Sequence, residues 1–228
     1  MAIPAIIKQE HLLLCSPTGS GKTLTAFLSI IDQLVRRALA GNLDKRVYCV
    51  YISPIKALAN DIERNLLGPL KEIYDRYLPD RAQEIRVGLR TGDTPQNERQ
   101  KMLRNPPHIL ITTPESLAIA ITSPRFQPIV SEVEYMIIDE LHSLVPSKRG
   151  VHLALTLSYL DTLLTRPVQR IGISATMEPL ETVAEFLVAS DDQESRTEAT
   201  KVCIAKVSGS RELDLDILLT DPKFSDLS

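Results

Sequence analysis

One octapeptide constrains the fold of this chain more than any other stretch. Residues 16–23 read Ser-Pro-Thr-Gly-Ser-Gly-Lys-Thr, between the apolar run 12–15 and a helix-like segment, 24–39. The glycines let several backbone N–H groups point at one place, and the positive end of the following helix favours an anion there. A strand, a loop and a helix in this order predict a phosphate-binding loop. The first position is Ser16 where the usual pattern has glycine, and a plain turn between strand and helix is the alternative.

The residue types of this loop assign an expected role to each position. Lys22 would reach the β- and γ-phosphates of ATP, and the Thr23 hydroxyl would hold Mg²⁺. The nucleotide-binding positions expected from the pattern are Pro17, Thr18, Gly19, Ser20, Gly21, Lys22 and Thr23.

Length and charge limit the class of protein. The chain has 228 residues, of which 43% are hydrophobic, so it can form one large domain or two small ones. The net charge of −3 indicates that any contact with nucleic acid comes from local patches. No apolar run is long enough to cross a membrane, and no secretory signal is present, which predicts a soluble, cytoplasmic protein. The three cysteines form no paired motif and are expected to be buried free thiols.

Short apolar runs alternate along the chain with helix-like segments. Seven strands are expected, at 12–15, 47–52, 85–89, 109–112, 135–139, 170–174 and 202–207. Six helices are expected, at 22–40, 55–77, 96–104, 114–121, 150–164 and 180–189; the last but one carries Val151, Leu155 and Tyr159 at helical spacing. This order predicts an α/β fold, with a mostly parallel sheet and helices on both faces. Residues 1–207 would form this domain, and 208–228 a linker or a peripheral strand.

Two acids follow an apolar run at 135–138. Asp139 would hold Mg²⁺ through water, and Glu140 would act as the general base toward the attacking water. The alternative is an acidic cap on the next helix. His142 follows two residues later and could sense what lies across the cleft, although a lone histidine is more often a surface or core residue.

A further strand ends in Ser174-Ala175-Thr176. These small hydroxyl residues could hydrogen-bond the acids that follow Asp139 and so couple the two segments. The alternative is an ordinary strand end whose hydroxyls cap a helix.

Together these segments resemble the motifs of a superfamily 2 helicase, and specifically its first RecA-like motor domain. Motif I would be 16–23, the DExH box 139–142 and motif III 174–176. Three other segments look like motif Ia, motif Ib and the TTPESL segment; they are 51–58, 90–95 with Glu98-Arg99, and 111–117. With Arg149-Gly150-Val151-His152-Leu153, the set is most similar to the Lhr (large helicase-related) family of ATP-dependent DNA helicases, over about residues 1–190.

The resemblance implies a motor half that binds ATP, Mg²⁺ and one nucleic-acid strand, DNA rather than RNA, and moves 3′ to 5′. A helicase needs a second RecA-like domain to supply an arginine finger, so the chain looks like a piece of a longer protein with low activity of its own. Two other functions stay open: a stand-alone P-loop phosphotransferase or switch, and a nucleotide-binding docking module without unwinding activity.

The resemblance also assigns the strand-binding residues. Hydroxyls at the strand ends would donate to the sugar–phosphate backbone, Gly92 would allow close approach, and the helix that begins near Pro114 would present free N–H groups. The residues implied are Ser53, Pro54, Lys56, Thr91, Gly92, Thr112, Thr113, Pro114 and Glu115. For each segment the alternative is a loop that caps a helix.

Overall fold

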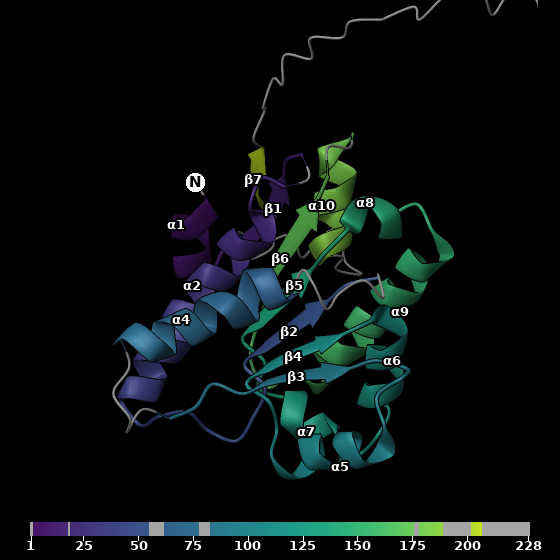
Figure 1. Ribbon diagram of the computed structural model, residues 1–228. Coiled ribbons are helices and arrows are strands. Elements are labelled where there is room, and N and C mark those ends of the chain that lie inside the picture. The colour runs from purple at the N-terminus through teal and green to yellow at the C-terminus, as the bar shows by residue number, and fades with distance from the viewer. Residues whose placement is uncertain are drawn as a thin grey trace, which may run out of the picture.

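The computed structural model describes residues 2–17, 19–54, 62–77, 83–175, 178–188 and 202–206. Within these ranges seven strands form one sheet in the order β3-β4-β2-β5-β6-β1-β7, and every pairing is parallel (Figure 1). The strands are β1 (His11–Cys15), β2 (Cys49–Ile52), β3 (Val87–Arg90), β4 (Ile109–Thr112), β5 (Tyr135–Ile138), β6 (Gln169–Ser174) and β7 (Val202–Lys206). The predicted parallel α/β sheet is confirmed.

Helices cover both faces of this sheet (Figure 1). One face is covered by α1 (Ala2–Ile7), α2 (Lys22–Leu39), the π-helical turn η1 (Glu63–Leu67) and α4 (Gly68–Tyr77). The helices after β3 are α5 (Gln96–Arg104), α6 (Pro114–Ile121), α7 (Gln127–Val130), α8 (Leu141–Leu144), α9 (Lys148–Leu163) and α10 (Leu180–Val188). Of these, α6 to α10 contribute buried side chains to the core on the opposite face.

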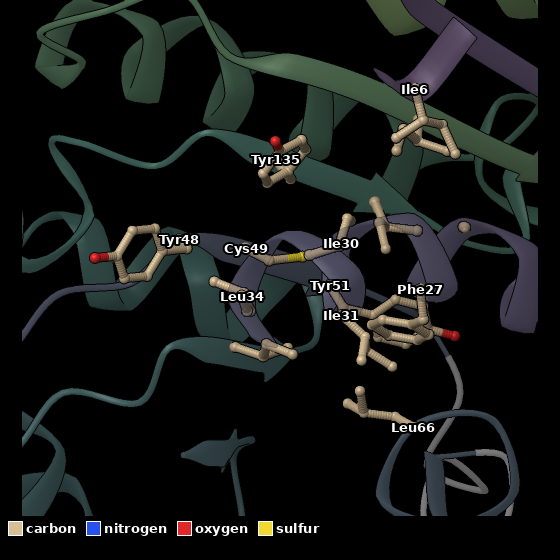
Figure 2. Packing of buried hydrophobic residues seen from close by; sticks show 14 of the residues in the cluster. Ile6, Phe27, Ile30, Ile31, Leu34, Tyr48, Cys49, Tyr51, Leu66 and Tyr135 are labelled. Atoms are coloured by element: carbon tan, nitrogen blue, oxygen red, sulfur yellow. The ribbon is translucent and has the colours of Figure 1, made fainter. Parts of the chain in front are cut away.

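The central strands alternate their side chains between two hydrophobic cores. On β5, Tyr135 and Ile137 face the layer that contains α2, and Met136 and Ile138 face the layer that contains α9. Each fully buried aliphatic side chain contributes about 1.5–3 kcal/mol to folding. Because both faces of the strand are buried, these positions are apolar in succession. Figure 2 shows the first core, where the side chains of α2 lie against those of β2 and β5.

The structure differs from the sequence prediction at several elements. Helix α1 was not predicted; it buries Ala5 and Ile6 against the first core. The single helix expected over 55–77 is divided within its described part into η1 and α4, and α4 begins at Gly68-Pro69, where proline at the first turn is tolerated. Residues 55–61 and 207–228 lie outside the described residues, and with them the expected linker. The four-residue helices α7 and α8 were also not predicted.

The parallel topology brings the carboxyl ends of the strands to one edge of the sheet, where the candidate functional loops begin. No helix in the described part of the chain is both long and apolar enough to cross a membrane. The three cysteines are free thiols: Cys15 and Cys49 are buried as predicted, whereas Cys203 is only half-buried.

Candidate functional site

The loop between β1 and α2 has the backbone that its glycines predict. Gly19 and Gly21 have φ angles of 77° and 81°, in the left-handed region that residues with a Cβ rarely adopt. Ser16 is 2% exposed, and its hydroxyl hydrogen-bonds that of Ser20. A serine at the first position is therefore accommodated by a bond across the loop. Thr18 lies outside the described residues.

The Lys22 ammonium lies inside the curve of this loop. Its Nζ donates to the carbonyl oxygen of Ser16 and, at 2.8 Å, to that of Pro17. Partial burial lowers the pKa of Lys22, and the nearby carboxylates of Asp139 and Glu140 act in the opposite direction. The first residue of α2 thus places a cation between the loop and the acids that follow β5.

The Asp139 carboxylate accepts hydrogen bonds from three groups around it. Its Oδ1 accepts from the backbone N–H of Glu140 at 2.7 Å, and its Oδ2 accepts from the Thr23 hydroxyl at 3.5 Å and from the Tyr51 hydroxyl. The side chain is 7% exposed, and burial raises the pKa of Asp139, opposed first by the Tyr51 hydrogen bond. Since Thr23 and Asp139 share a contact, the two residues predicted to hold a metal ion do lie together.

Tyr51 is a member of the site that the sequence analysis did not single out. It lies on β2 in register with Ile137 of the neighbouring β5, two residues before Asp139. Its ring packs against Phe27 with centroids 5.1 Å apart (Figure 2). In the sequence Tyr51 is the first residue of the segment that resembles motif Ia, but a tyrosine that closely follows Tyr48 and Cys49 is by itself a weak indication of a bond to Asp139.

Glu140 and His142, which follow Asp139 in the chain, contact each other through their side chains. Glu140 has φ 56°, an unusual conformation for a non-glycine residue and one that clusters at functional sites. His142 accepts from the Ala175 N–H at Nδ1, at 3.1 Å, so in the neutral ring the proton lies on Nε2, 3.0 Å from Glu140 Oε2. Glu140 occupies the N-cap position of α8, as the alternative of an acidic cap supposed, but its side chain makes no capping hydrogen bond there.

The segment after β6 contacts the acids differently from the prediction. Among the described residues the Ser174 hydroxyl is buried without a hydrogen-bond partner, and Thr176 lies outside them. The link runs instead through the backbone of Ala175, whose N–H binds His142 and whose carbonyl accepts from the Cys15 thiol at 3.2 Å. For Ser174 the predicted coupling through a hydroxyl is not what the structure has, and the prediction for Thr176 stays untested. The backbone contacts of Ala175 are of a kind that sequence patterns do not reveal.

The predicted strand-binding residues lie at the same sheet edge, but several are buried. Ser53, Thr112 and Pro114 are buried, and the Thr112 hydroxyl donates to the carbonyl oxygen of Arg90 at 2.8 Å. Thr112 therefore cannot offer its hydroxyl to a ligand, and that expectation is wrong. Pro54 is half-buried, and Lys56 lies outside the described residues.

Thr113 acts as the cap of α6, the alternative considered for it. Its Oγ1 accepts from the N–H of Ser116 at 3.3 Å and donates to the Ser116 hydroxyl at 3.0 Å, and its carbonyl accepts from the N–H of Leu117. The first turn of α6 thus has fewer free N–H groups than expected. Glu115 at this turn is exposed.

Arg99 supports the loop after β3 through hydrogen bonds to its backbone. The guanidinium donates to the carbonyl oxygens of Thr94, Gly92 and Thr91 at 2.8, 2.9 and 3.3 Å. Gly92 is exposed, and a Cβ there would meet no other atom within 4 Å, so the surface around it is open. Arg99 was noted within a motif but not as a support for this loop.

Arg149 joins two of these segments, and this too was missed. Its Nε donates to Glu115 Oε1 at 2.7 Å, and its Nη2 donates to Glu115 Oε2 at 3.2 Å and to the Pro54 carbonyl at 3.1 Å. The arginine is the second residue of α9 and connects the start of α6 to the loop after β2. The Arg-Gly pair in the sequence was the available signal.

Comparison with known proteins agrees with this arrangement. The family model described as DEAD/DEAH box helicase matches residues 1–186. The chain belongs to the DEAD/DEAH box helicase family. The match covers every element from α1 to most of α10, and so includes the whole site described above.

Relatives within this helicase family carry the Lhr name, which confirms the predicted resemblance. The ATP-dependent helicase Lhr-Core of Methanothermobacter thermautotrophicus is 52% identical over 218 residues, 95% of this chain and 25% of that protein. The Lhr helicase/uracil glycosylase of Escherichia coli is 51% identical over 186 residues, 79% of this chain and 12% of that protein. The chain therefore spans a quarter or less of the length of these relatives.

A solved helicase structure has the same fold. The Mycobacterium smegmatis helicase Lhr, determined bound to ssDNA and AMP-PNP, matches with a TM-score of 0.76 and 43% identity, covering 91% of this chain and 25% of that one. The predicted RecA-like fold is confirmed by this match.

Proposed function

We propose that this chain is the nucleotide-binding motor half of an Lhr-type ATP-dependent DNA helicase, which binds ATP with Mg²⁺ and one nucleic-acid strand. The proposal rests on one observation. Lys22 and Thr23, which follow β1 and the glycine loop, lie beside Asp139, which follows β5. In the sheet, β6 lies between β5 and β1. The helicase bound to ssDNA and AMP-PNP supports the assignment of both ligands.

The donor set fits ATP and Mg²⁺. Backbone N–H groups of a left-handed glycine loop, a helix N-terminus and the Lys22 ammonium suit phosphate oxygens. The Thr23 hydroxyl and the Asp139 carboxylate offer the oxygen ligands that Mg²⁺ prefers, with few ligands from the protein itself. When bound, the ion neutralises charge that develops on the phosphates during transfer.

Glu140 is suited to act as the general base. The His142 ring contacts Glu140 Oε2 at 3.0 Å and so orients the carboxylate, which is the group that would accept the proton of an attacking water. Because His142 also binds Ala175 after β6, a shift of that segment would change the orientation of the base. This gives the DExH residues a route to couple hydrolysis to the neighbouring loops.

The longer relatives support the view that a second motor domain completes the enzyme. An arginine finger from such a domain contributes about 10³-fold or more in related sites, so this chain alone is expected to turn over slowly. A stand-alone phosphotransferase would need a second small-molecule site and would not explain the strand-binding loops. A docking module would not need Lys22, Thr23, Asp139 and Glu140 together.

The Lys22→Ala substitution tests the nucleotide site directly. Losing a charged donor to phosphate is expected to weaken binding of a fluorescent ATP analogue by about 10- to 100-fold. The matched control is Lys71→Ala, which removes an exposed lysine on α4 and is expected to bind like the parent protein. Unchanged affinity in Lys22→Ala would favour the docking module.

The Tyr51→Phe substitution tests how Asp139 is held. Phenylalanine keeps the packing against Phe27 but removes the hydroxyl that donates to Asp139 Oδ2. The Mg²⁺-dependent gain in nucleotide affinity is expected to fall about tenfold, while affinity measured in a chelator stays unchanged. Titrations of labelled nucleotide with and without Mg²⁺ measure both quantities. Equal weakening in both conditions would show that Tyr51 only supports the fold.

A further inference from the structure

Arg149 occupies a place where three segments of the candidate strand-binding face meet. It is the second residue of α9, and its guanidinium contacts both carboxylate oxygens of Glu115 on α6 and the backbone carbonyl of Pro54 in the loop after β2. The described residues thus connect motif Ia, the TTPESL segment and the Arg-Gly segment through one side chain. These three segments are far apart in the sequence.

The exposure of this ion pair argues against a role in fold stability alone. The side chains of Arg149 and Glu115 are 46% and 49% exposed. Solvated pairs of this kind contribute little to stability, although the forked geometry fixes the orientation of both partners. The hydrogen bond from Arg149 holds the pKa of Glu115 below its usual value, so the carboxylate stays ionised and available to the guanidinium.

The position of Glu115 poses an electrostatic problem for a nucleic-acid ligand. A carboxylate in the first turn of α6 is stabilised by the helix dipole, but it would repel a phosphate that approached the same turn. The forked contact with Arg149 fixes the direction of this carboxylate, with both of its oxygens bound to the guanidinium. The hydrogen bond from Arg149 to the Pro54 carbonyl anchors the start of the loop that follows β2. In the same loop, the backbone N–H of Ser53 donates to the carbonyl oxygen of Thr112 at 3.1 Å.

We propose that Arg149 is a positioning residue for strand binding, which holds the start of the loop after β2 against the start of α6 through its forked contact with Glu115 and its bond to Pro54. This inference rests on the proposed strand-binding function. Arg149 acts through the two segments rather than by neutralising a phosphate itself. A lysine would keep the charge at this place but could not present a planar fork to Glu115 and the Pro54 carbonyl together.

The test compares Arg149→Ala, Arg149→Lys and the parent chain in binding a fluorescein-labelled oligo(dT) of about 20 nucleotides. Anisotropy titrations at several salt concentrations give the affinity and its salt slope. The matched control is Arg36→Ala, which removes the same charge from an exposed ion pair with Asp32 on α2. Thermal unfolding of each variant reports on the fold.

The positioning role predicts that both Arg149 variants bind about five- to tenfold more weakly than the parent, with an unchanged salt slope and an unfolding midpoint near that of the parent. The control is expected to bind like the parent. Full binding by Arg149→Lys, or a slope reduced by about 0.7 in Arg149→Ala, would overturn the inference, because charge alone would then explain the effect. Unaffected binding in both variants would overturn it as well.

The same titration separates this inference from the proposed function. A parent chain that binds the oligonucleotide while the variants bind equally well contradicts the role of Arg149 only. A parent chain that does not bind at low salt contradicts strand binding itself, and the role of Arg149 with it.

Discussion

The Glu140→Gln substitution is expected to lower the ATP turnover of this chain by about 100-fold or more, with nucleotide affinity near the parent value. The amide keeps the shape of the side chain and can still accept from His142 Nε2, but it cannot take a proton from water. Loop contacts from Lys22 and the oxygens of Thr23 and Asp139 are untouched. Release of inorganic phosphate measures the first quantity, and titration of a labelled nucleotide measures the second.

The control for this substitution is Glu181→Gln, which neutralises an exposed glutamate in the first turn of α10. It is expected to hydrolyse ATP at the parent rate. Parent-like turnover in Glu140→Gln would mean that another group takes the proton. Loss of nucleotide affinity together with turnover would mean that Glu140 supports binding rather than the chemical step.

The Gly150→Ala substitution is expected to lower the free energy of unfolding by about 3 kcal/mol or more. A Cβ on Gly150 would lie 2.2 Å from the carbonyl oxygen of Leu144 and 2.8 Å from its carbonyl carbon. These are backbone atoms at the end of α8, so the clash is relieved only if α8 and α9 move apart. For a domain of this size the unfolding midpoint should fall by about 6–12 °C.

Gly92→Ala is the matched control for stability, because a Cβ at Gly92 would meet no other atom within 4 Å. Its unfolding midpoint should change by the equivalent of less than about 1 kcal/mol. A small effect of Gly150→Ala would show that α9 adjusts its position freely. Since α8 carries His142, a displaced α8 should also reduce turnover in the Gly150 variant.

The sheet could be predicted from the sequence because its central strands are buried on both faces. Such strands read as unbroken apolar runs, and β4 and α6 were placed at their observed bounds. The orientation of α9 could not be predicted, because both of its faces carry apolar residues. Val151 and Leu155, which share one helical face, are 63% and 68% exposed, whereas Leu153 and Leu157 are buried.

Local sequence motifs predicted the residues that would bind phosphate and metal, but not the residues that hold them or the neighbouring loops in place. The glycine loop and the acids after β5 are recognisable because phosphate and metal chemistry restricts their residue types and spacing. The Tyr51 bond to Asp139 spans 88 positions, and the Arg149 bond to Glu115 spans 34. Contacts of this kind depend on strand order and helix packing, which one sequence does not specify.

The error over Thr112 has a related cause. A threonine at a strand end can turn its hydroxyl either to solvent or to a neighbouring strand, and the residue type is the same in both cases. In the structure β3 lies beside β4, and the Arg90 carbonyl takes the hydrogen bond. The pairing of two strands separated in the chain by α5 decided the role of this side chain.

The central claim is that the chain holds one half of an ATPase site and awaits a second motor domain. The most direct measurement is ATP hydrolysis by the parent chain with and without single-stranded DNA, with Glu140→Gln in parallel. Because an arginine finger contributes about 10³-fold or more, the account predicts slow turnover that DNA does not raise and that Glu140→Gln abolishes. Fast turnover stimulated by DNA at least about tenfold would contradict the claim, since the chain would then assemble a complete site without a second domain.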